Sequence, residues 1–420
     1  MKSVSTVRGT RDILPSEVGF WQEIEWMSKD IFARYQFQEI RTPIFESTEL
    51  FQESIGSDTD IVSKEMYTFT DKGDRSLTLR PEGTAAIARS YVQQALDKQS
   101  QVAKWYYSGP MFRYERPQAG RFRQFHQIGS EHIGTKDPAA DAELISLAVH
   151  LFEELGIPDL SVKINSVGCP VCRPVIEERI KQFLAPNLKN LCTDCNTRYD
   201  QNTLRILDCK KEGCKMYFTG LPDIRSSLCQ DCTDHFEVVL EYLDAQGVDF
   251  QIDQLLVRGL DYYTKTAFEV VSNKLGAQNA VCGGGRYDHL IERVGGKSIP
   301  AVGFAFGVER TVMLIKDLVH TRQAPVDIYL IPMGHTQRKK CFVLQSELRK
   351  AGFSVLLGLD DSLKKQFKKA SQAGAKFAFV YGEEEAASGK GVLKDLDKRE
   401  QEEIPLKQLM NTLKERCDDK

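Results

Sequence analysis

The chain has 420 residues, of which 41% are hydrophobic and 27% charged, and its formal net charge is −3. This composition is typical of a globular protein with several domains, and it excludes fibrous, collagen-like and wholly disordered chains. No apolar run reaches the roughly 18 residues that a membrane-spanning helix needs. The N-terminal residues also lack the hydrophobic region of a signal peptide. We therefore expect a cytoplasmic protein with no membrane association.

The first zone, residues 1–167, mixes helical and extended patterns. Apolar residues recur at helical spacing over Trp21–Tyr35, which predicts an amphipathic helix. Alternating or apolar segments predict strands over Lys104–Tyr107, Arg121–Ile128 and Val162–Asn165.

Residues 168–245 differ in composition from both flanking zones, because eight of the eleven cysteines lie between Cys169 and Cys232. We interpret this zone as an insertion. In a long chain expected in a reducing compartment, clustered cysteines favour metal binding over disulfides.

The third zone, residues 246–322, returns to strands and glycine-rich segments. Strands are expected over Leu255–Val257 and Ala267–Val271, and a helix over Val308–Leu318. Gly283–Gly285 predicts either a tight turn or a close approach of the backbone to another group. No Lys-Ser or Lys-Thr pair follows these glycines, which argues against a phosphate-binding P-loop.

The last zone, residues 326–420, follows a predicted linker at 321–325 and alternates strands with helices. This order predicts a small mixed or parallel sheet flanked by helices. The expected strands are Val326–Pro332, Phe353–Leu359 and Lys376–Gly382, and the expected helices are Thr336–Ala351, Ser362–Ala373 and Pro405–Arg416.

The clustered cysteines form four close pairs, which could build two sites of four thiolates each. Adjacent pairing of the first two pairs fits the spacing of zinc ribbons, although the sequence leaves the pairing open. His235 is a spare ligand, and reduced thiols without a metal are the alternative. The pairs are Cys169/Cys172, Cys192/Cys195, Cys209/Cys214 and Cys229/Cys232.

Four arginines crowd around a predicted turn between Tyr106 and Glu131. The turn contains Pro117 and Gly120, which indicates a strand–loop–strand hairpin. Several convergent guanidinium groups typically bind an anion such as phosphate, and a solvated, charge-rich hairpin is the alternative. The arginines are Arg113, Arg116, Arg121 and Arg123.

Two further segments carry polar side chains that suit a small ligand. In Leu77–Thr84, Glu82 and Thr84 are two residues apart, so they would share one side of an extended chain and could hold an ammonium group. In Leu256–Val270, an arginine, an aspartate and two tyrosines could line a polar pocket, or the tyrosines could simply pack. These four are Arg258, Asp261, Tyr262 and Tyr263.

Six segments, in order along the chain, carry a resemblance to the class II aminoacyl-tRNA synthetases, and specifically to the histidyl-tRNA synthetase family. Three resemble the class motifs 1, 2 and 3, two resemble the histidine signature peptides, and one resembles the family's N-terminal signature. The class motifs 1, 2 and 3 are Arg41–Phe51, Tyr106–Glu131 and Gly303–Leu314. The histidine signatures are Arg258–Thr264 and Cys282–Leu290, and the N-terminal signature is Gly9–Pro15.

The resemblance implies an α+β protein whose catalytic core is an antiparallel β-sheet. Residues 1–167 and 246–322 would form this core, 168–245 the Cys-rich insertion, and 326–420 a C-terminal α/β anticodon-binding domain. The implied reaction uses ATP and Mg²⁺ to join L-histidine to a histidine tRNA through histidyl-adenylate. Motif 1, marked by Pro43, implies a homodimer, although an edge-strand proline is the alternative.

The resemblance also assigns the residues of the active site. Arg113 and Arg258 would stabilise the reacting phosphate, and an ion pair with Asp261 is the alternative for Arg258. ATP would contact Arg113, Glu115 and Arg310, although Glu115 could instead pair with Arg116 or Arg121. Glu309 is the candidate ligand for Mg²⁺. Histidine would contact Glu82, Gly83, Thr84, Arg113, Gln127, Glu131, Arg258, Tyr262 and Tyr263, while Tyr287 would pack at the pocket wall.

Other residues are implied for tRNA and for a metal. The tRNA contacts would be Arg116, Gln118, Arg121, Lys364 and Lys368, although lysines on a helix often serve only solvation. The insertion could hold structural Zn²⁺ through its eight cysteines. A non-catalytic regulatory paralogue and a prolyl or threonyl enzyme are the competing hypotheses. The C-terminal domain and the three arginines Arg113, Arg258 and Arg310 argue against the regulator, and the signature from Arg258 together with Glu131 argues against the other enzymes.

Overall fold

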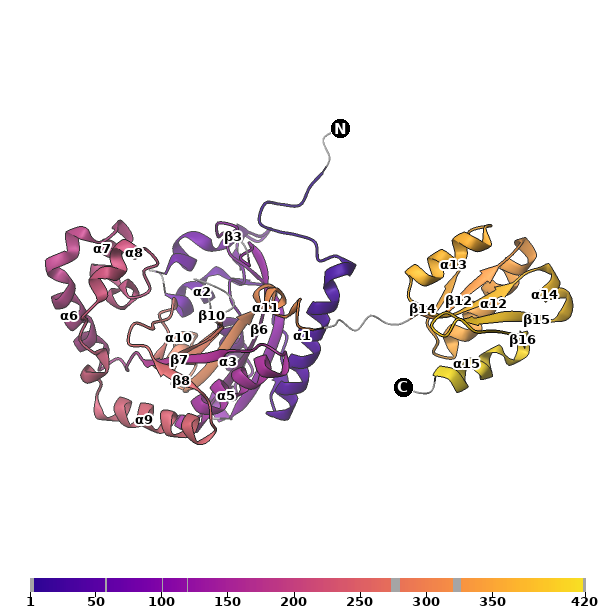
Figure 1. The fold of residues 1–420 in the computed structure, drawn as a ribbon. Helices are drawn as coiled ribbons and strands as arrows, with labels where there is room; N and C mark the ends of the chain where they lie inside the picture. Colours follow the sequence, from indigo (N-terminus) through magenta and orange to yellow (C-terminus); the bar gives the residue numbers. More distant parts are fainter. Residues whose placement is uncertain are drawn as a thin grey trace. The chain divides into compact units, whose positions relative to one another are not determined.

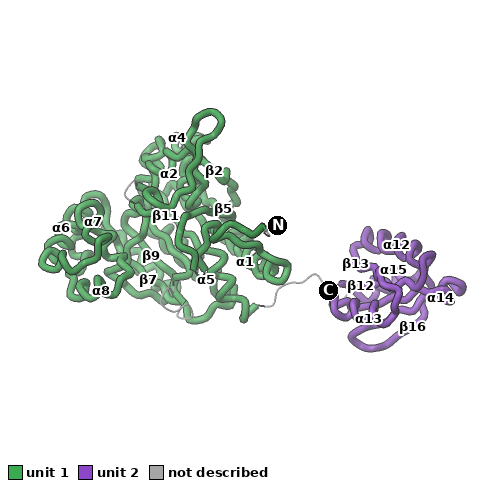
Figure 2. The backbone as a smooth tube through the Cα atoms, turned by 90° about the horizontal axis from the view of Figure 1, so that it is seen from above, with its two compact units in different colours: residues 1–321 green, residues 322–420 purple. Residues whose placement is uncertain are grey.

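The computed structural model describes residues 4–56, 59–99, 101–118, 120–272, 280–319 and 326–417. The chain divides into two compact units, residues 1–321 and 322–420 (Figure 2). The predicted linker at 321–325 lies outside the described residues. Within the described ranges, no helix is both long enough and apolar enough to span a bilayer.

An eight-stranded sheet forms the centre of the first unit (Figure 1). Its six central strands are antiparallel to their neighbours, whereas the short strand at each edge pairs in parallel. The predicted antiparallel core is therefore confirmed. Across the sheet the strands are β1 (Gln38–Glu39), β5 (Ala103–Phe112), β6 (Gln124–Ile133), β11 (Ala301–Gly307), β10 (Ala280–Arg286), β9 (Thr264–Ser272), β7 (Leu160–Ser166) and β8 (Phe250–Ile252).

Four helices pack with this sheet into one hydrophobic core. They are α1 (Pro15–Arg34), α5 (Pro138–Glu154), α9 (Gln230–Ala245) and α11 (Val308–Ile315). The predicted helix near Trp21 is confirmed, and it begins earlier than expected because Pro15 occupies the first helical turn, where its missing N–H costs nothing.

A small three-stranded sheet accompanies motif 1, in the order β2 (Phe45–Ser47), β4 (Ser76–Leu79) and β3 (Tyr67–Thr70). The buried Arg80 fixes this region to the core, since its guanidinium donates to the carbonyls of Thr42 at 3.0 Å and Pro110 at 2.9 Å. Helices α2 (Thr48–Ile55) and α3 (Thr84–Gln93) follow β2 and β4 in the chain.

The cysteine-rich zone is mostly helical. After β7 the chain forms α6 (Arg173–Leu184), α7 (Thr193–Gln201) and α8 (Glu212–Lys215), and then returns through α9 to β8. Figure 1 shows α6, α7 and α8 grouped at one end of the first unit, away from α1. The side chains of this zone share a core with α3, α10 (Leu290–Arg293) and the loop that precedes β9.

Two expectations for the third zone need correction. Leu255–Val257 is not a strand; the strand is β8, which ends at Ile252, and the residues after it form a loop that lines the cavity described below. Gly283–Gly285 lies within β10 and is not a tight turn. The expected close approach is confirmed, because a side-chain carbon on any of these glycines would collide with a neighbour.

The second unit has a five-stranded mixed sheet, as predicted. Its order is β13 (Val355–Leu357), β12 (Val326–Pro332), β14 (Ala375–Tyr381), β15 (Lys390–Asp395) and β16 (Gln401–Pro405), and the first three strands are parallel. Helices α12 (His335–Lys350) and α15 (Leu409–Cys417) pack on one face, and α13 (Leu363–Gln372) on the other. The final helix starts later than expected because β16 extends to Pro405 and a 3-10 turn occupies Leu406–Gln408.

Candidate active site and metal centres

A cavity of about 600 Å³ lies over strands β6, β10 and β11 in the first unit. The β5–β6 loop, the loop after β8, the start of α11, single residues of β7 and β9, and part of the cysteine-rich zone also line it. Seven cationic and five acidic side chains line it, and this positive excess suits an anionic ligand. The cations are Arg113, Arg121, Lys163, Lys210, Lys215, Arg258 and Arg310, and the acids are Glu115, Asp208, Asp253, Glu269 and Glu309.

Arg113 enters the cavity from the end of β5. Its Nε donates to the carbonyl of Pro81 at 2.8 Å, and its guanidinium lies over the ring of Phe125, 5.3 Å from the centroid. These contacts fix the side chain. The hydrogen bond uses only Nε, so the two terminal nitrogens can contact other groups in the cavity. The predicted hairpin is confirmed, since β5 and β6 pair antiparallel up to Phe112 and Gln124.

Arg258 enters the cavity from the loop between β8 and β9. It forms an ion pair with Glu269 of β9, a residue that the sequence did not suggest. Burial opposes the charge of Arg258, but Glu269 together with Tyr263 and Cys282 outweighs burial and raises the pKa of the guanidinium. The expected alternative pair with Asp261 does not form, because Asp261 accepts a hydrogen bond from Asn202 at 2.7 Å.

Gly283 of β10 makes room for Arg258. A Cβ atom on Gly283 would lie 2.5 Å from Arg258 Cζ, well inside van der Waals contact. Gly283 therefore lets the guanidinium cross the sheet. Within the described residues, the buried Arg258 Nε has no hydrogen-bond partner.

A second group of predicted residues lies buried next to this cavity and does not line it. Glu131 of β6 accepts hydrogen bonds from the Thr84 hydroxyl at 2.7 Å and from the Tyr287 hydroxyl. Burial raises the pKa of Glu131 to about 8. The rings of Tyr262 and Tyr263 pack beside it with centroids 4.8 Å apart. Tyr287, expected only to pack, is thus a polar member of the group.

The sequence suggested that Glu82 and Thr84 share one side of an extended chain, and this expectation is wrong. Thr84 is the first residue of α3, and Glu82 accepts from the backbone N–H groups of Thr84 at 2.6 Å and Ala85 at 2.8 Å. Free N–H groups at a helix start bind carboxylates well. Gly83 is required because a Cβ there would lie 2.8 Å from the Tyr107 hydroxyl.

Gln127 of β6 lines the cavity with an unused acceptor. Its Oε1 atom is buried and, among the described residues, receives no hydrogen bond. A buried amide oxygen without a donor costs free energy, so a ligand that supplies an N–H would recover it.

The remaining predicted ATP residues also line the cavity. Glu115 accepts from Arg121 at 3.5 Å, which realises one of the expected alternatives. Arg310 of α11 donates to the carbonyl of Ala280 at 2.7 Å. Glu309 accepts from the backbone N–H of His126 at 2.9 Å, which ties α11 to β6.

The predicted tRNA-binding side chains are exposed in two places. Arg116, Gln118 and Arg121 lie on the β5–β6 loop, where Gln118 and Arg121 exchange backbone hydrogen bonds. Lys364 and Lys368 lie on the exposed face of α13 in the second unit.

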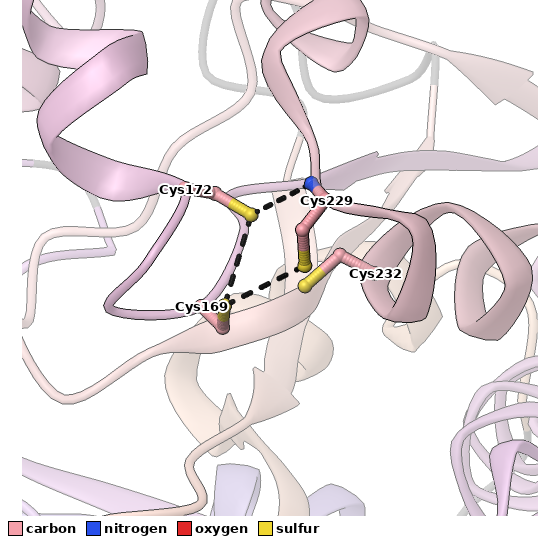
Figure 3. A group of neighbouring side chains, drawn as sticks. All are labelled: Cys169, Cys172, Cys229 and Cys232. Carbon is pink, nitrogen blue, oxygen red and sulfur yellow. Dashed lines mark hydrogen bonds between the residues drawn. The ribbon is translucent and has the colours of Figure 1, made fainter.

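The eight clustered cysteines form two groups, and adjacent pairing, the option that fits zinc-ribbon spacing, is not the one formed. The outer group joins the first pair to the last, Cys169 and Cys172 with Cys229 and Cys232 (Figure 3). The inner group joins the middle pairs, Cys192 and Cys195 with Cys209 and Cys214. Within each group every sulfur lies within 4.8 Å of the others. The pairing is thus nested, with one group inside the loop closed by the other.

The geometry of both groups fits a tetrahedral metal ion. Sγ–Sγ distances of 3.7 and 3.9 Å in the outer group, and 3.9 Å in the inner group, agree with the roughly 3.8 Å edge of a four-thiolate zinc site. Backbone N–H groups donate to Cys172 and Cys214, as they do to thiolates. Cys172, Cys192 and Cys229 each precede a helix, whose N-terminal dipole favours the anionic form.

The insertion is fastened to the catalytic core by polar contacts. Arg198 of α7 and Arg205 both reach Asp60, at 3.0 and 3.2 Å. Asn202 bonds Asp261 within the predicted histidine signature. None of these long-range partners leaves a local pattern in the sequence.

Comparison with known proteins gives consistent results. A family model described as Histidyl-tRNA synthetase matches residues 9–311, and one described as Anticodon binding domain matches 327–416. Histidine--tRNA ligases of Desulforamulus reducens and Halothermothrix orenii are each 48% identical, covering 97% and 98% of this chain and 98% and 99% of their own. The crystal structure of apo S. aureus histidyl-tRNA synthetase has 36% identity and a TM-score of 0.83, covering 98% of this chain and 100% of that one.

The antiparallel core sheet, the arginine-lined cavity above it and the C-terminal α/β unit define a class II aminoacyl-tRNA synthetase. Within that class, the chain belongs to the histidyl-tRNA synthetase family. This family consists of ligases that use ATP to charge tRNA with histidine, so the predicted family, fold class and enzyme class are confirmed.

Proposed function

We propose that this chain activates L-histidine with ATP to form histidyl-adenylate and then transfers the histidyl group to the terminal ribose of a histidine tRNA. One observation carries the proposal beyond family membership. Arg113 and Arg258 enter one cavity from separate chain segments, beside the unused acceptor of Gln127.

The two arginines would supply the electrostatics of the first step. The histidine carboxylate attacks the α-phosphate of ATP, so two anions must approach one another. Guanidinium groups held in place before the reaction stabilise the charge that develops on the phosphate. Glu115 and Arg310, which line the same cavity, would contact the adenine end and the phosphates of ATP.

Mg²⁺ would bind mainly through the phosphates of ATP and would help to neutralise them. Glu309 is the candidate protein ligand, because its carboxylate lines the cavity and is oriented by His126. The chain's own contribution is to keep this carboxylate fixed at the start of α11.

Histidine recognition would use the buried group next to the cavity. The α-ammonium would donate to Gln127, Glu82 and Thr84, and the imidazole would lie between Glu131 and Tyr263. A carboxyl group facing one ring nitrogen and a phenol facing the other select a single tautomer. Such a pocket rejects apolar analogues strongly, because its polar groups would then be left unpaired. Gly83 and Tyr262 would complete its walls.

The tRNA would contact both units. In the first unit, Gln118 would read a base edge near the acceptor end, and Arg116 and Arg121 would hold phosphates. In the second unit, Lys364 and Lys368 would contact the backbone of the anticodon arm. The exposure of all five side chains supports these roles.

We assign residues 1–167 and 246–322 to the catalytic domain, 168–245 to the insertion and 326–420 to the anticodon-binding domain. We also propose a cytoplasmic homodimer. The small sheet near motif 1 supports the dimer, because Ile44, Phe45 and Phe69 are about half exposed there, although such residues are usually buried.

We further propose that each cysteine group holds one structural Zn²⁺. The tetrahedral spacing of the sulfurs supports this assignment. The metal would stabilise an insertion that has short helices, and histidine and ATP would be handled by other residues.

Histidine-dependent exchange of pyrophosphate into ATP tests the proposed function on the purified chain. Exchange with histidine, but not with proline, threonine or no amino acid, is the expected result. Folded protein that binds histidine without exchange would instead indicate a regulatory paralogue. A solved relative with such a title, an ATP phosphoribosyltransferase regulatory subunit/histidyl-tRNA synthetase from Bacillus halodurans C, has 22% identity and a TM-score of 0.62 and shares only the fold.

A further inference from the structure

We infer that Lys210 and Lys215 bind the triphosphate of ATP and the pyrophosphate product, and that the inner cysteine group positions both lysines at the cavity. This inference rests on the proposed function and adds two substrate-binding residues to it. Neither lysine belongs to a class motif or to a histidine signature.

The sequence couples each lysine directly to a cysteine of the inner group. Lys210 follows Cys209, and Lys215 follows Cys214. The only regular element between them is α8, a helix of four residues (Glu212–Lys215). So short a helix is unstable alone, since nucleation costs more than one turn returns. The location of both lysines therefore depends on the contacts among the four cysteines of the inner group.

The inner group is in turn fixed to the catalytic core. Its other two cysteines lie at the start of α7, and Arg198 of the same helix pairs with Asp60 at 3.0 Å. Asn202, which directly follows α7, donates to Asp261 at 2.7 Å. A continuous path thus leads from the core through α7 and the four sulfurs to the two lysines.

The lysines line the same cavity as Arg113 and Arg258. They reach it from the insertion, whereas the arginines reach it from the core strands and loops. Compact ammonium groups on flexible stems suit the many oxygens of a polyphosphate, as arginine forks suit a single phosphate. The two lysines line the cavity, whereas the proposed tRNA contacts of this unit lie on the exposed β5–β6 loop. This location favours ATP over the phosphodiesters of tRNA as their ligand.

Each lysine now pairs with a nearby acid. Lys210 lies 2.6 Å from Asp208, and Lys215 lies 2.7 Å from Glu212. The two lysine side chains are 79% and 47% exposed, and exposed pairs of this kind contribute little free energy. A phosphate can therefore displace the acids at low cost.

The test uses the full chain with Lys210→Gln and Lys215→Gln combined. In the exchange assay we expect the KM values for ATP and pyrophosphate to rise about tenfold, as expected for lost charge-assisted contacts, with the KM for histidine within twofold. The matched control is Lys211→Gln. Lys211 lies in the same loop, pairs with Asp194 at 3.4 Å and does not line the cavity, so all three KM values should stay within twofold.

Cys214→Ser tests the positioning role of the inner group. We expect a similar rise in the KM for ATP, and a triple variant with both lysine substitutions should be no worse than the double variant, because coupled residues are not additive. If Cys214→Ser does not fold, the second measurement is the KM for ATP of the unmodified chain after chelation and again after zinc is restored. A KM that rises and then recovers supports the inference, and an unchanged KM overturns the positioning role.

Two results would overturn the assignment of the lysines. One is an unchanged KM for ATP and pyrophosphate in the double variant while the unmodified chain exchanges normally. The other is a rise only in the KM for tRNA in the complete charging reaction, which would assign the lysines to the acceptor end. If the unmodified chain shows no exchange, the proposed function fails. The Kd for pyrophosphate, measured by calorimetry, then tests the inference about the two lysines separately. A tenfold weaker Kd in the double variant supports the inference, and an equal Kd overturns it.

Discussion

The Thr84 hydroxyl donates a hydrogen bond of 2.7 Å to Glu131, which joins the first residue of α3 to strand β6. The other carboxylate oxygen accepts from the Tyr287 hydroxyl. These donors favour the ionised form, but burial outweighs them and holds the Glu131 pKa at about 8. Near neutral pH the carboxyl group is therefore mostly protonated in the folded chain, and it can donate to one nitrogen of a bound imidazole.

This pKa predicts a pH-dependent stability. The unfolded chain releases the Glu131 proton near its ordinary pKa of 4.5, whereas the folded chain keeps it until about pH 8. The contribution of Glu131 to the free energy of unfolding is therefore present at low pH and is lost as the pH rises across this interval. Glu131→Gln should remove the loss. From about pH 5 to pH 8, the stability of the variant relative to the unmodified chain should rise by roughly 3 kcal/mol.

Urea unfolding followed by tryptophan fluorescence measures this effect, because all three tryptophans, Trp21, Trp26 and Trp105, lie in the first unit. A stability difference that is the same at both pH values would contradict the raised pKa.

Arg258→Ala should lower the rate of histidine-dependent exchange by about 10²–10³-fold, the usual loss when a fixed group that stabilises transition-state charge is removed. Arg258→Lys should recover only part of it, since an ammonium group lacks the planar fork. Circular dichroism controls for folding. A change confined to the KM for histidine would show that Arg258 binds substrate without stabilising the reacting phosphate.

Gly283→Ala should impair activity far more than stability. The new methyl group would meet the far end of the Arg258 side chain, which can move aside without disturbing the sheet. We expect at least a tenfold loss of exchange rate, with a change in unfolding free energy of no more than about 1 kcal/mol. Gly73→Ala is the control, because its Cβ would meet only ordinary contacts at 3.4 and 3.7 Å. Equal losses of activity in both variants would refute this account.

Asp141→Asn should destabilise the first unit by about 3 kcal/mol or more. Asp141 is fully buried and accepts from Arg286 Nε at 3.1 Å and from His235 at 3.3 Å, so the variant removes the buried partner of the guanidinium and leaves it only the pair with Asp288 at 3.3 Å. Asp30→Asn removes an exposed pair with Arg34 in the same unit and should cost less than about 1 kcal/mol. Similar urea midpoints for the two variants would contradict the distinction.

The purified chain should contain two zinc ions per molecule, measured by atomic emission. Cys192→Ser should retain one zinc ion and Cys341→Ser two, because Cys341 is buried in the second unit, outside both groups. Chelation should also lower the melting temperature of the unmodified chain, since structural zinc contributes folding free energy. A chain that folds fully without metal, or that loses both ions in Cys192→Ser, would contradict two independent sites.

Local pattern predicted much of this molecule. Apolar spacing located α1, turn residues located the β5–β6 hairpin, and alternation of strands and helices located the second unit. Each of these signals arises from neighbours along the chain, and the family motifs are likewise contiguous. The strands β15 and β16 were missed because their charged residues mask the alternation.

The partners of the site residues could not be predicted in the same way. Glu269 meets Arg258, and Tyr287 meets Glu131, only through the register of the central sheet. The glycines of β10 suggested a turn because the groups that require them, such as the Arg258 guanidinium beside Gly283, come from other segments. Ligand spacing alone also favoured adjacent cysteine pairs, whereas the folded chain brings the first and last pairs together.

The outer cysteine group gathers the two places where the insertion leaves and rejoins the core. Cys169 and Cys172 lie just after β7, and Cys229 and Cys232 lie at the start of α9, which leads back to β8. Once a metal joins them, the two crossings cannot separate. Residues 173–228 are then held to the core at this crossing as well as through Asp60 and Asp261, so that they cannot slide along the core or stretch away from it.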